Sequence, residues 1–484
     1  MVMNYIILVV GMGLLVYLGF KANKIAGSED EAGFLLGGRS FGPFVAAGTL
    51  MATGFSGWGF VGSPGAAYAY GPTELLANFF FAPAILIAIL FFSNFMRRRA
   101  LKLGSLTLPE YIAQQHGATE GWTRVLQGLA GLITVLMMLT FIIGQVKALG
   151  SIASEWLNLP FNVGAFLMII IIIAYTTAGG LAAVAWTDVV MVMGMAFAAI
   201  VIMFQIFGDT DMSDMIKTLG AMDPELVNPE GAQPYGGFKA AAFLTLPWAF
   251  LWAAVVPYMG IRFLGMKETT KERTTALIGL PLGLVLSLVP IVGMYVRAQG
   301  IELAEPDLAM ATYLNTYMPA FLTGLISLFI LFAMGSTADS ILHTMASAVG
   351  HDLRKAVFGE KKFSGKEKLI INRSTVVVMG LLGFVLYITS PPFFINFMAY
   401  LGAGTLQATL IAPIFISTFW KGNAVGALAS MVGGFLTCTI LLFFTQLGWV
   451  VSPLLADAVA VFLYFAVSLA TFDYMPRLED QPAR

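Results

Sequence analysis

Long apolar runs separated by short polar segments dominate the chain. A helix that crosses a lipid bilayer needs about 20 mostly apolar residues, within a range of about 17 to 25. Runs of this kind predict thirteen membrane-spanning helices, at about 3–21, 43–69, 74–96, 124–150, 161–178, 186–208, 238–262, 275–297, 318–347, 371–390, 393–417, 422–446 and 452–472. The first run lacks both the basic residue before it and the small-residue cleavage pattern after it that a signal peptide has, which predicts a retained helix.

The basic residues support this count, because cytoplasmic loops collect Lys and Arg. With thirteen spans and the N-terminus outside, the inner segments hold every one of the 26 basic residues except Lys147, Lys217, Lys239 and Arg297. The outer loops between 209 and 237 and between 298 and 317 are acidic instead. We therefore predict that the N-terminus lies outside and the C-terminus inside, in a multi-pass protein of the inner (plasma) membrane.

Composition agrees with a protein that lies mostly in lipid. Hydrophobic residues make up 58% of the chain and charged residues 11%, whereas soluble proteins have about 25% charged residues. The net charge of −1 argues against a nucleic-acid partner, and the single cysteine, Cys438, excludes an intramolecular disulfide. No loop is long enough to build a soluble domain, so the function belongs to the membrane bundle, as a transporter, a channel or an intramembrane enzyme. Metal-ligand spacing, a nucleophile elbow and a phosphate loop are all missing, which predicts that the chain is no enzyme.

Two spans carry residues that interrupt a helix. The second has six glycines within 48–65, around Ser56 and Trp58, and the seventh has Pro247 and Pro257. Glycine weakens a helix by about 1 kcal/mol relative to alanine, and proline removes a hydrogen bond. Small residues also allow close helix packing, but a cluster this dense favours unwinding near the middle of the membrane.

Broken helices at matching positions of two halves are typical of the binding site of a secondary transporter. Spans two and seven are five apart, so spans 2–6 and 7–11 would form two five-helix units. Because five is odd, the second unit enters the membrane in the opposite sense. The predicted organisation is an extra helix and inner loop (1–42), a first repeat (43–208), an outer loop (209–237), an inverted second repeat (238–417), and two further helices with a short inner tail (418–484).

The ninth span ends in the polar sequence AMGSTADSILHT, from Ala333 to Thr344. Ser336, Ser340, His343 and Ser347 share one helical face, and Thr337 and Asp339 flank it. Ionisable groups inside a membrane are expensive and by default mark a functional path. The hydroxyls could instead bond back to carbonyls one turn earlier. The carboxylate of Asp339, together with the break in span two, favours a site for a hard cation bound by oxygen atoms.

Other polar and aromatic residues have two interpretations each. Asp188, at the start of the sixth span, could be functional or could be an acid at a helix N-terminus. Trp58, Trp248 and Trp252 could line a substrate pocket or pack in the core, and Gln145 could bind a solute by hydrogen bonds.

Five motifs resemble the sodium/solute symporter family, whose members carry proline, pantothenate, monocarboxylates, sialic acid, sugars or iodide. They are FLLGGRS (34–40), SGW…GSPGAAYAYG (56–71), TLPEY (107–111), GGLAAVAWTDVVM (179–191) and GSTADS (335–340). The motifs occur in the family's order along nearly the whole chain. The resemblance implies an all-α fold of about thirteen helices with an inverted five-plus-five repeat of the leucine-transporter type.

The resemblance also implies ligands for the coupling ion, Na⁺. The principal sodium site would use the backbone carbonyls of Ala52, Phe55 and Ala333 with the hydroxyls of Ser336 and Thr337. A second cation site in some members would correspond here to Asp188, Asp339 and Ser340. Position 339 is a hydroxyl in the simpler version, so the carboxylate could strengthen a second cation site or hold a proton.

The function implied is sodium-coupled import of a small organic solute by alternating access. The solute would carry a carboxylate, as pantothenate, a short monocarboxylate and proline do, and no obligatory protein partner is indicated. The substrate pocket would be formed by Phe55, Ser56, Gly57, Trp58, Gln145, Trp248 and Trp252. No Lys or Arg is predicted in mid-membrane, except Lys147 near an outer end, so the carboxylate would meet N–H groups at half-helix ends.

The alternatives are proton coupling through Asp339 and Asp188 on the same scaffold, a channel, and a sensor that retains the transporter fold. Sensors of this kind fuse a kinase after the last span, whereas this chain ends about a dozen residues beyond it.

Overall fold

The structure is a computed structural model that describes residues 2–26, 30–228, 234–236, 241–359 and 363–472. Within those ranges the chain forms helices and no β-strand; Phe41 and Met266 form an isolated bridge. The helices are α1 (Val2–Ala26), α2 (Glu31–Leu36), η1 (Gly37–Arg39), α3 (Pro43–Gly54), η2 (Trp58–Gly62), α4 (Ser63–Tyr70), α5 (Thr73–Phe79), α6 (Phe81–Ala88), η3 (Ile89–Ser93), α7 (Asn94–Leu103), α8 (Leu108–His116), α9 (Glu120–Leu157), α10 (Phe161–Asp209), α11 (Met212–Met222), η4 (Pro224–Val227), η5 (Ala241–Leu244), α12 (Thr245–Val255), α13 (Pro257–Gly265), α14 (Glu272–Leu286), α15 (Ile291–Ala298), η6 (Pro306–Leu308), α16 (Ala309–Tyr317), α17 (Ala320–Ser347), η7 (Ala348–Leu353), α18 (Arg354–Phe358), α19 (Gly365–Thr389), α20 (Ile395–Ile414), η9 (Ile416–Thr418), α21 (Ala424–Phe444) and α22 (Val451–Ala470).

The described residues contain 10 helices that are long and apolar enough to cross a membrane, or up to 12 if each of two bent pairs counts as one span. The difference from the predicted thirteen lies in α10, which contains both the fifth and the sixth predicted spans. Its 49 residues would extend about 74 Å as a straight helix, more than twice the hydrocarbon thickness of about 30 Å. It is not straight, because Gly180 has φ 56° and ψ −151°. A side chain at Gly180 would also collide with Phe34. The count of thirteen stays a prediction.

The predicted break in span two is present between α3 and η2. The two parts, Pro43–Gly54 and Trp58–Tyr70, are bent by 49°. Phe55 ends α3 with φ −102° and ψ 72°, and the backbone resumes helical geometry at Gly57. Gly57 is needed for packing as well, since a Cβ there would lie 2.6 Å from Oε1 of Gln145. The glycines therefore serve both unwinding and close helix contact.

The predicted break in span seven lies at Pro257. Ala241–Val255 and Pro257–Gly265 are bent by 57°, and Val256 between them has the extended backbone that a residue before proline favours. Pro247 causes no break. It lies in the first turn of α12, where a missing N–H costs no helical hydrogen bond.

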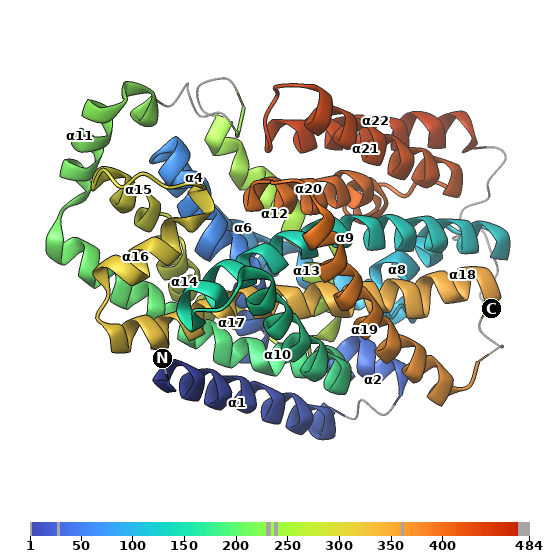
Figure 1. Cartoon of the computed structure of the whole chain (residues 1–484). Helices are drawn as coiled ribbons and strands as arrows, with labels where there is room; N and C mark the ends of the chain where they lie inside the picture. The colour runs from blue at the N-terminus through green and yellow to red at the C-terminus, as the bar shows by residue number, and fades with distance from the viewer. Residues whose placement is uncertain (1, 27–29, 229–233, 237–240, 360–362, 473–484) are drawn as a thin grey trace.

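Figure 1 shows α1 along one edge of the bundle and α21 and α22 along the opposite edge. Both edges expose large apolar side chains, such as Val9 of α1 and Phe444 of α21, as lipid-facing helices do. The most apolar segments of α9, α17 and α20 are mainly buried between these edges. α1 begins at the end of the bundle that holds α11, and α22 ends at the opposite end, which also holds α18 (Figure 1). The side of the membrane that each end faces stays a prediction.

A buried ionic network joins α2, α8 and η7 at the end of the bundle that is predicted to be cytoplasmic. His351 lies between two carboxylates, with Nδ1 3.2 Å from Glu31 and Nε2 3.1 Å from Glu110. Arg354 and Lys355 add ion pairs of 2.7 Å to Glu31 and Glu110 respectively. Burial alone would raise the pKa of Glu31 and Glu110, but hydrogen bonds and charges from these partners lower each pKa to about 2.

This network predicts a specific dependence of stability on pH. A carboxyl whose pKa is lower in the folded chain stabilises the fold above the ordinary pKa of about 4.5, and this contribution is lost as the pH falls toward about 2. Between pH 5 and 8 Glu31 and Glu110 should therefore contribute a constant amount to the free energy of unfolding. We expect Glu31→Gln/Glu110→Gln to lower the unfolding midpoint at pH 7 and to flatten its fall between pH 5 and 3, measured by thermal unfolding in detergent. A variant whose midpoint falls with pH as steeply as that of the parent chain would contradict this assignment.

Candidate functional site

The break in α3 faces the polar stretch of α17. The Oγ atom of Ser336 lies 3.0 Å from the carbonyl oxygen of Ala52 and 2.8 Å from that of Ala333. Thr337 donates from Oγ1 to the carbonyl oxygen of Thr53 at 3.1 Å. All of these residues are buried. Phe55 ends α3, so its carbonyl belongs to the last turn, which has no helical partners of its own.

These contacts bring three of the five predicted sodium ligands together, namely Ala52, Ala333 and Ser336. Thr337 bonds to the neighbouring carbonyl of Thr53, and Phe55 lies at the adjacent helix end. Hydroxyl and carbonyl oxygens are the donors that hard cations take. The described residues hold no group of three His, Cys, Asp or Glu that could bind a metal ion. Hydroxyl and carbonyl oxygens suit a hard cation better than a transition metal, which favours nitrogen and sulfur ligands.

Arg262 corrects an expectation from the sequence, which placed this residue in an inner loop. It lies in α13 and is fully buried. Its guanidinium donates to Thr49 at 2.7 Å, Thr53 at 2.6 Å, Ser340 at 2.5 Å and Asp188 at 3.1 Å. The carbonyl of Tyr258 accepts a further bond. The bend at Pro257 directs α13 back into the bundle, where α3, α10 and α17 supply these acceptors.

The predicted second cation site surrounds this guanidinium. Asp188 accepts hydrogen bonds from Thr49 at 2.5 Å and from Arg262, and it lies inside α10, so the alternative of a helix N-terminal acid is wrong. Asp339 accepts from the Tyr175 hydroxyl at 2.9 Å and from Ser340 at 3.1 Å. Asp188 and Ser340 thus both accept hydrogen bonds from the guanidinium of Arg262. A mobile second cation would have to compete with this guanidinium for their oxygen atoms. Asp339 forms no ion pair within the described residues.

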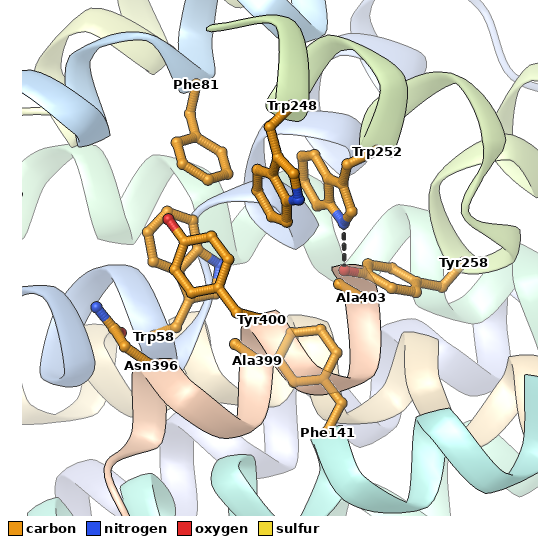
Figure 2. Close-up of a pocket in the computed structure, with 10 residues that line it drawn as sticks. All are labelled: Trp58, Phe81, Phe141, Trp248, Trp252, Tyr258, Asn396, Ala399, Tyr400 and Ala403. Atoms are coloured by element: carbon orange, nitrogen blue, oxygen red, sulfur yellow. Dashed lines mark hydrogen bonds between the residues drawn. The ribbon is translucent and has the colours of Figure 1, made fainter. Parts of the chain in front are cut away.

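A narrow aromatic pocket lies beside the break in α3, with a cavity volume of about 10 Å³. Figure 2 shows Trp248 and Trp252 side by side with parallel rings, whose centroids are 6.2 Å apart, and Trp252 bonded to the Tyr258 hydroxyl. The residues that line it are Trp58, Phe81, Phe141, Trp248, Trp252, Tyr258, Asn396, Ala399, Tyr400 and Ala403.

Three predicted substrate residues, Trp58, Trp248 and Trp252, line this pocket. Phe55, Ser56, Gly57 and Gln145 do not line it, although Gln145 lies against Gly57 with both amide atoms buried and unpartnered.

The sequence prediction missed the contribution of α20. Asn396, Ala399, Tyr400 and Ala403 recur at intervals of three, one and three, the spacing of one helical face, so periodicity could have grouped them. Phe81, Phe141 and Tyr258 carry no comparable signal in the sequence.

Comparison with known proteins gives three consistent results. Residues 34–434 match the model of the sodium:solute symporter family. The osmoregulated proline transporter OpuE of Bacillus subtilis is 26% identical over 434 residues, covering 86% of this chain and 84% of that protein. The high-affinity proline transporter PutP of Bacillus subtilis is 26% identical over 436 residues, covering 87% and 89%.

Two solved structures share the fold. A Na⁺-coupled sialic acid symporter in a substrate-bound outward-open state superposes with a TM-score of 0.77 at 17% identity, covering 98% of both chains. Mhp1, a nucleobase-cation-symport-1 family transporter in a closed conformation, superposes with a TM-score of 0.57 at 17% identity, covering 91% of this chain and 95% of that one.

Proposed function

Because the chain belongs to the sodium:solute symporter family, we propose that it is a sodium-coupled secondary active symporter that imports a small organic solute bearing a carboxylate. The observation that carries this proposal is the convergence of the Ser336 hydroxyl with the carbonyls of Ala52 and Ala333 at a helix break, beside a narrow aromatic pocket. Proline, pantothenate and a short monocarboxylate are the candidate solutes, and the proline transporters among the relatives favour proline.

The topology belongs to the same proposal. Thirteen spans, with the N-terminus outside and the C-terminus inside, would place residues 43–208 and 238–417 as inverted five-helix units. The two bent helix pairs, α3 with η2–α4 and η5–α12 with α13, lie at corresponding positions of those units. The likeness to two transporter structures supports a common fold for the core.

In the proposed mechanism, sodium would act by holding two helices, α17 and α3, together. An ion bound by Ser336, Thr337 and the carbonyls of Ala52, Phe55 and Ala333 would fix α17 against the broken end of α3. That end leads directly into η2, which carries Trp58 of the pocket. Sodium would thereby favour the state that binds solute, and by linkage the solute would tighten sodium by the same factor. Inward release would draw on about 2.3 kcal/mol per charge per 100 mV of membrane potential.

Proton coupling through Asp339 and Asp188 is the second candidate. The observation that favours it is that Asp339 is fully buried with a tyrosine and a serine hydroxyl as hydrogen-bond partners and, within the described residues, forms no ion pair. A carboxyl group in such surroundings is suited to carrying a proton.

Uptake into proteoliposomes separates the two candidates. Under an inward sodium gradient at equal pH on both sides, we expect radiolabelled proline to accumulate above its outside concentration. Replacing sodium by potassium should reduce accumulation to the level of empty liposomes. Full uptake without sodium under an inward proton gradient would overturn sodium coupling in favour of the Asp339 route.

A further inference from the structure

A second pocket, with polar walls, opens at the end of the bundle that is predicted to be cytoplasmic, and it shares no lining residue with the aromatic pocket. Its cavity volume is about 310 Å³, whereas one water molecule needs only about 10–15 Å³. Two of its described lining residues are basic and none is acidic, so its charge is suited to an anion. The polar lining residues come from α7, α8 and the segment between α20 and α21, and they are Arg99, Gln115, Ser417, Thr418 and Lys421.

The guanidinium of Arg99 is held in place without being neutralised. Its Nε atom donates to Oε1 of the buried Gln115 at 3.1 Å, which ties α7 to α8. Within the described residues Arg99 forms no ion pair, and its Nη1 and Nη2 atoms have no protein acceptor. The planar, forked donors of a guanidinium match the oxygen atoms of a phosphate group. One wall of the pocket therefore presents unused donors of the kind that bind phosphate.

Lys421 contributes the second positive charge from a turn that α22 holds in place. The backbone N–H of the following residue, Gly422, donates to the Tyr464 hydroxyl at 2.8 Å. The preceding residue, Trp420, packs against Tyr464 with ring centroids 5.7 Å apart. Because the residues on both sides of Lys421 are anchored, little conformational freedom would be lost when an anion binds there.

Both positive charges act on the same buried side chain. His116 of α8 lies against the Tyr464 hydroxyl, with its Nε2 atom at 2.7 Å. Burial, with smaller contributions from the charges of Lys421 and Arg99, lowers the pKa of His116 to about 4. His116 is therefore neutral near pH 7, and the pocket carries the two charges of Lys421 and Arg99.

The pocket lies at the level of the lipid headgroups. Two segments that are long and apolar enough to cross a membrane, Thr73–Leu103 and Ile395–Thr418, have their ends at this pocket. Three aromatic rings complete its lining. Phe95 and Phe419 are 41% and 77% exposed, as lipid-facing side chains are, and tryptophans such as Trp420 gather at the boundary between membrane and water. The basic groups are thus bordered by apolar rings that acyl chains can cover.

We propose that this pocket binds the headgroup of an anionic phospholipid of the inner leaflet. The phosphate oxygens accept hydrogen bonds from the Nη atoms of Arg99 and from Nζ of Lys421, and the acyl chains lie along Phe95 and Phe419. Basic pockets between membrane helices on the cytoplasmic side are suited to anionic headgroups. A free phosphate ion would leave the two rings uncovered, so the lipid is the better occupant. The inference does not depend on which solute or ion the chain carries.

Native mass spectrometry of the purified full-length protein in detergent micelles measures the affinity for single lipid molecules. Phosphatidylglycerol and phosphatidylcholine with identical acyl chains differ in the charge of the headgroup. A basic residue close to an anionic lipid strengthens binding by about fivefold, so two of them predict that phosphatidylglycerol binds about 30-fold more tightly than phosphatidylcholine.

Arg99→Gln/Lys421→Gln should reduce this ratio to about twofold or less, by weakening the binding of phosphatidylglycerol while leaving that of phosphatidylcholine unchanged. Arg98→Gln/Lys102→Gln is the matched control, because it removes two charges from exposed residues of the same helix that do not line the pocket. Its ratio should stay within about twofold of that of the parent chain. Thermal unfolding verifies that the variants are folded. If the first double variant is not folded, Lys421→Gln alone, which keeps the bond from Arg99 to Gln115, should lower the ratio about fivefold.

Equal affinities of the parent chain for the two lipids would overturn the inference. Equal ratios in the two folded double variants would overturn it too, because the preference would then come from the general charge of this surface. Competition with millimolar inorganic phosphate, at an ionic strength matched with chloride, separates a lipid from a soluble anion. The affinity for phosphatidylglycerol should fall by about twofold or less. A larger loss would assign the pocket to free phosphate and contradict the proposal.

Discussion

Replacement of Arg262 by methionine is expected to lower the free energy of unfolding by about 3–5 kcal/mol and to abolish sodium-driven uptake. The side chain is fully buried and bonds to Asp188, Thr49, Thr53 and Ser340, which come from three different helices. Its removal leaves the carboxylate of Asp188 buried without its ion-pair partner. The expected loss exceeds that of a surface ion pair, because water cannot enter to replace the guanidinium.

Denaturant titration in mixed micelles, followed by tryptophan fluorescence, measures the effect on stability. Arg124→Met provides the comparison, since Arg124 pairs with Glu120 at 2.7 Å on an exposed surface and should cost less than about 1 kcal/mol. Arg262→Met/Asp188→Asn should recover part of the lost stability, because the unpaired charge is removed with its partner. Equal stability losses in Arg262→Met and Arg124→Met would show that the buried network contributes little.

Removal of both hydroxyls in Ser336→Ala/Thr337→Ala is expected to raise the sodium concentration for half-maximal uptake by about tenfold to 100-fold. Each lost ligand should cost about 1 kcal/mol or more of sodium binding, and every 1.4 kcal/mol corresponds to a factor of ten. Proline uptake at saturating sodium should be reduced much less. Initial rates of uptake in proteoliposomes across a sodium series give both quantities.

Ser347→Ala is the matched control on the same helix, because the Ser347 hydroxyl bonds back to the carbonyl of His343 at 2.8 Å and lies away from the break in α3. Its sodium dependence should equal that of the parent chain. An unchanged sodium requirement in the double variant would remove Ser336 and Thr337 from the coupling site.

The sequence was informative wherever local composition controls the backbone. Apolar runs predicted a multi-pass helical protein, and family membership and the long apolar helices of the structure support that description. The glycine cluster of span two and Pro257 of span seven located both breaks, because missing side chains and a missing N–H act on the helix that contains them. The polar face of span nine likewise placed Ser336 against the first break.

Residues whose environment depends on several helices were misplaced or missed. A charge next to the end of an apolar run indicates a loop, so Arg262 was assigned to the inner surface. Its burial is tolerated only because α3, α10 and α17 converge on it with matching acceptors, and no local pattern contains that convergence. Asn396 and Tyr400 were missed for a related reason, because the sequence of α20 does not show that this face of the helix borders the pocket.

The sequence by itself determined that most of this chain forms apolar helices and where two of them break, since both depend on interactions within a few residues. Only the tertiary structure decided which helix faces meet: α20 turns Asn396 and Tyr400 toward the pocket that Trp58 of η2 and Trp248 of α12 also line. Helical periodicity groups residues on a face but does not choose the neighbour of that face. That choice depends on packing and on the pairing of buried polar groups across the whole bundle.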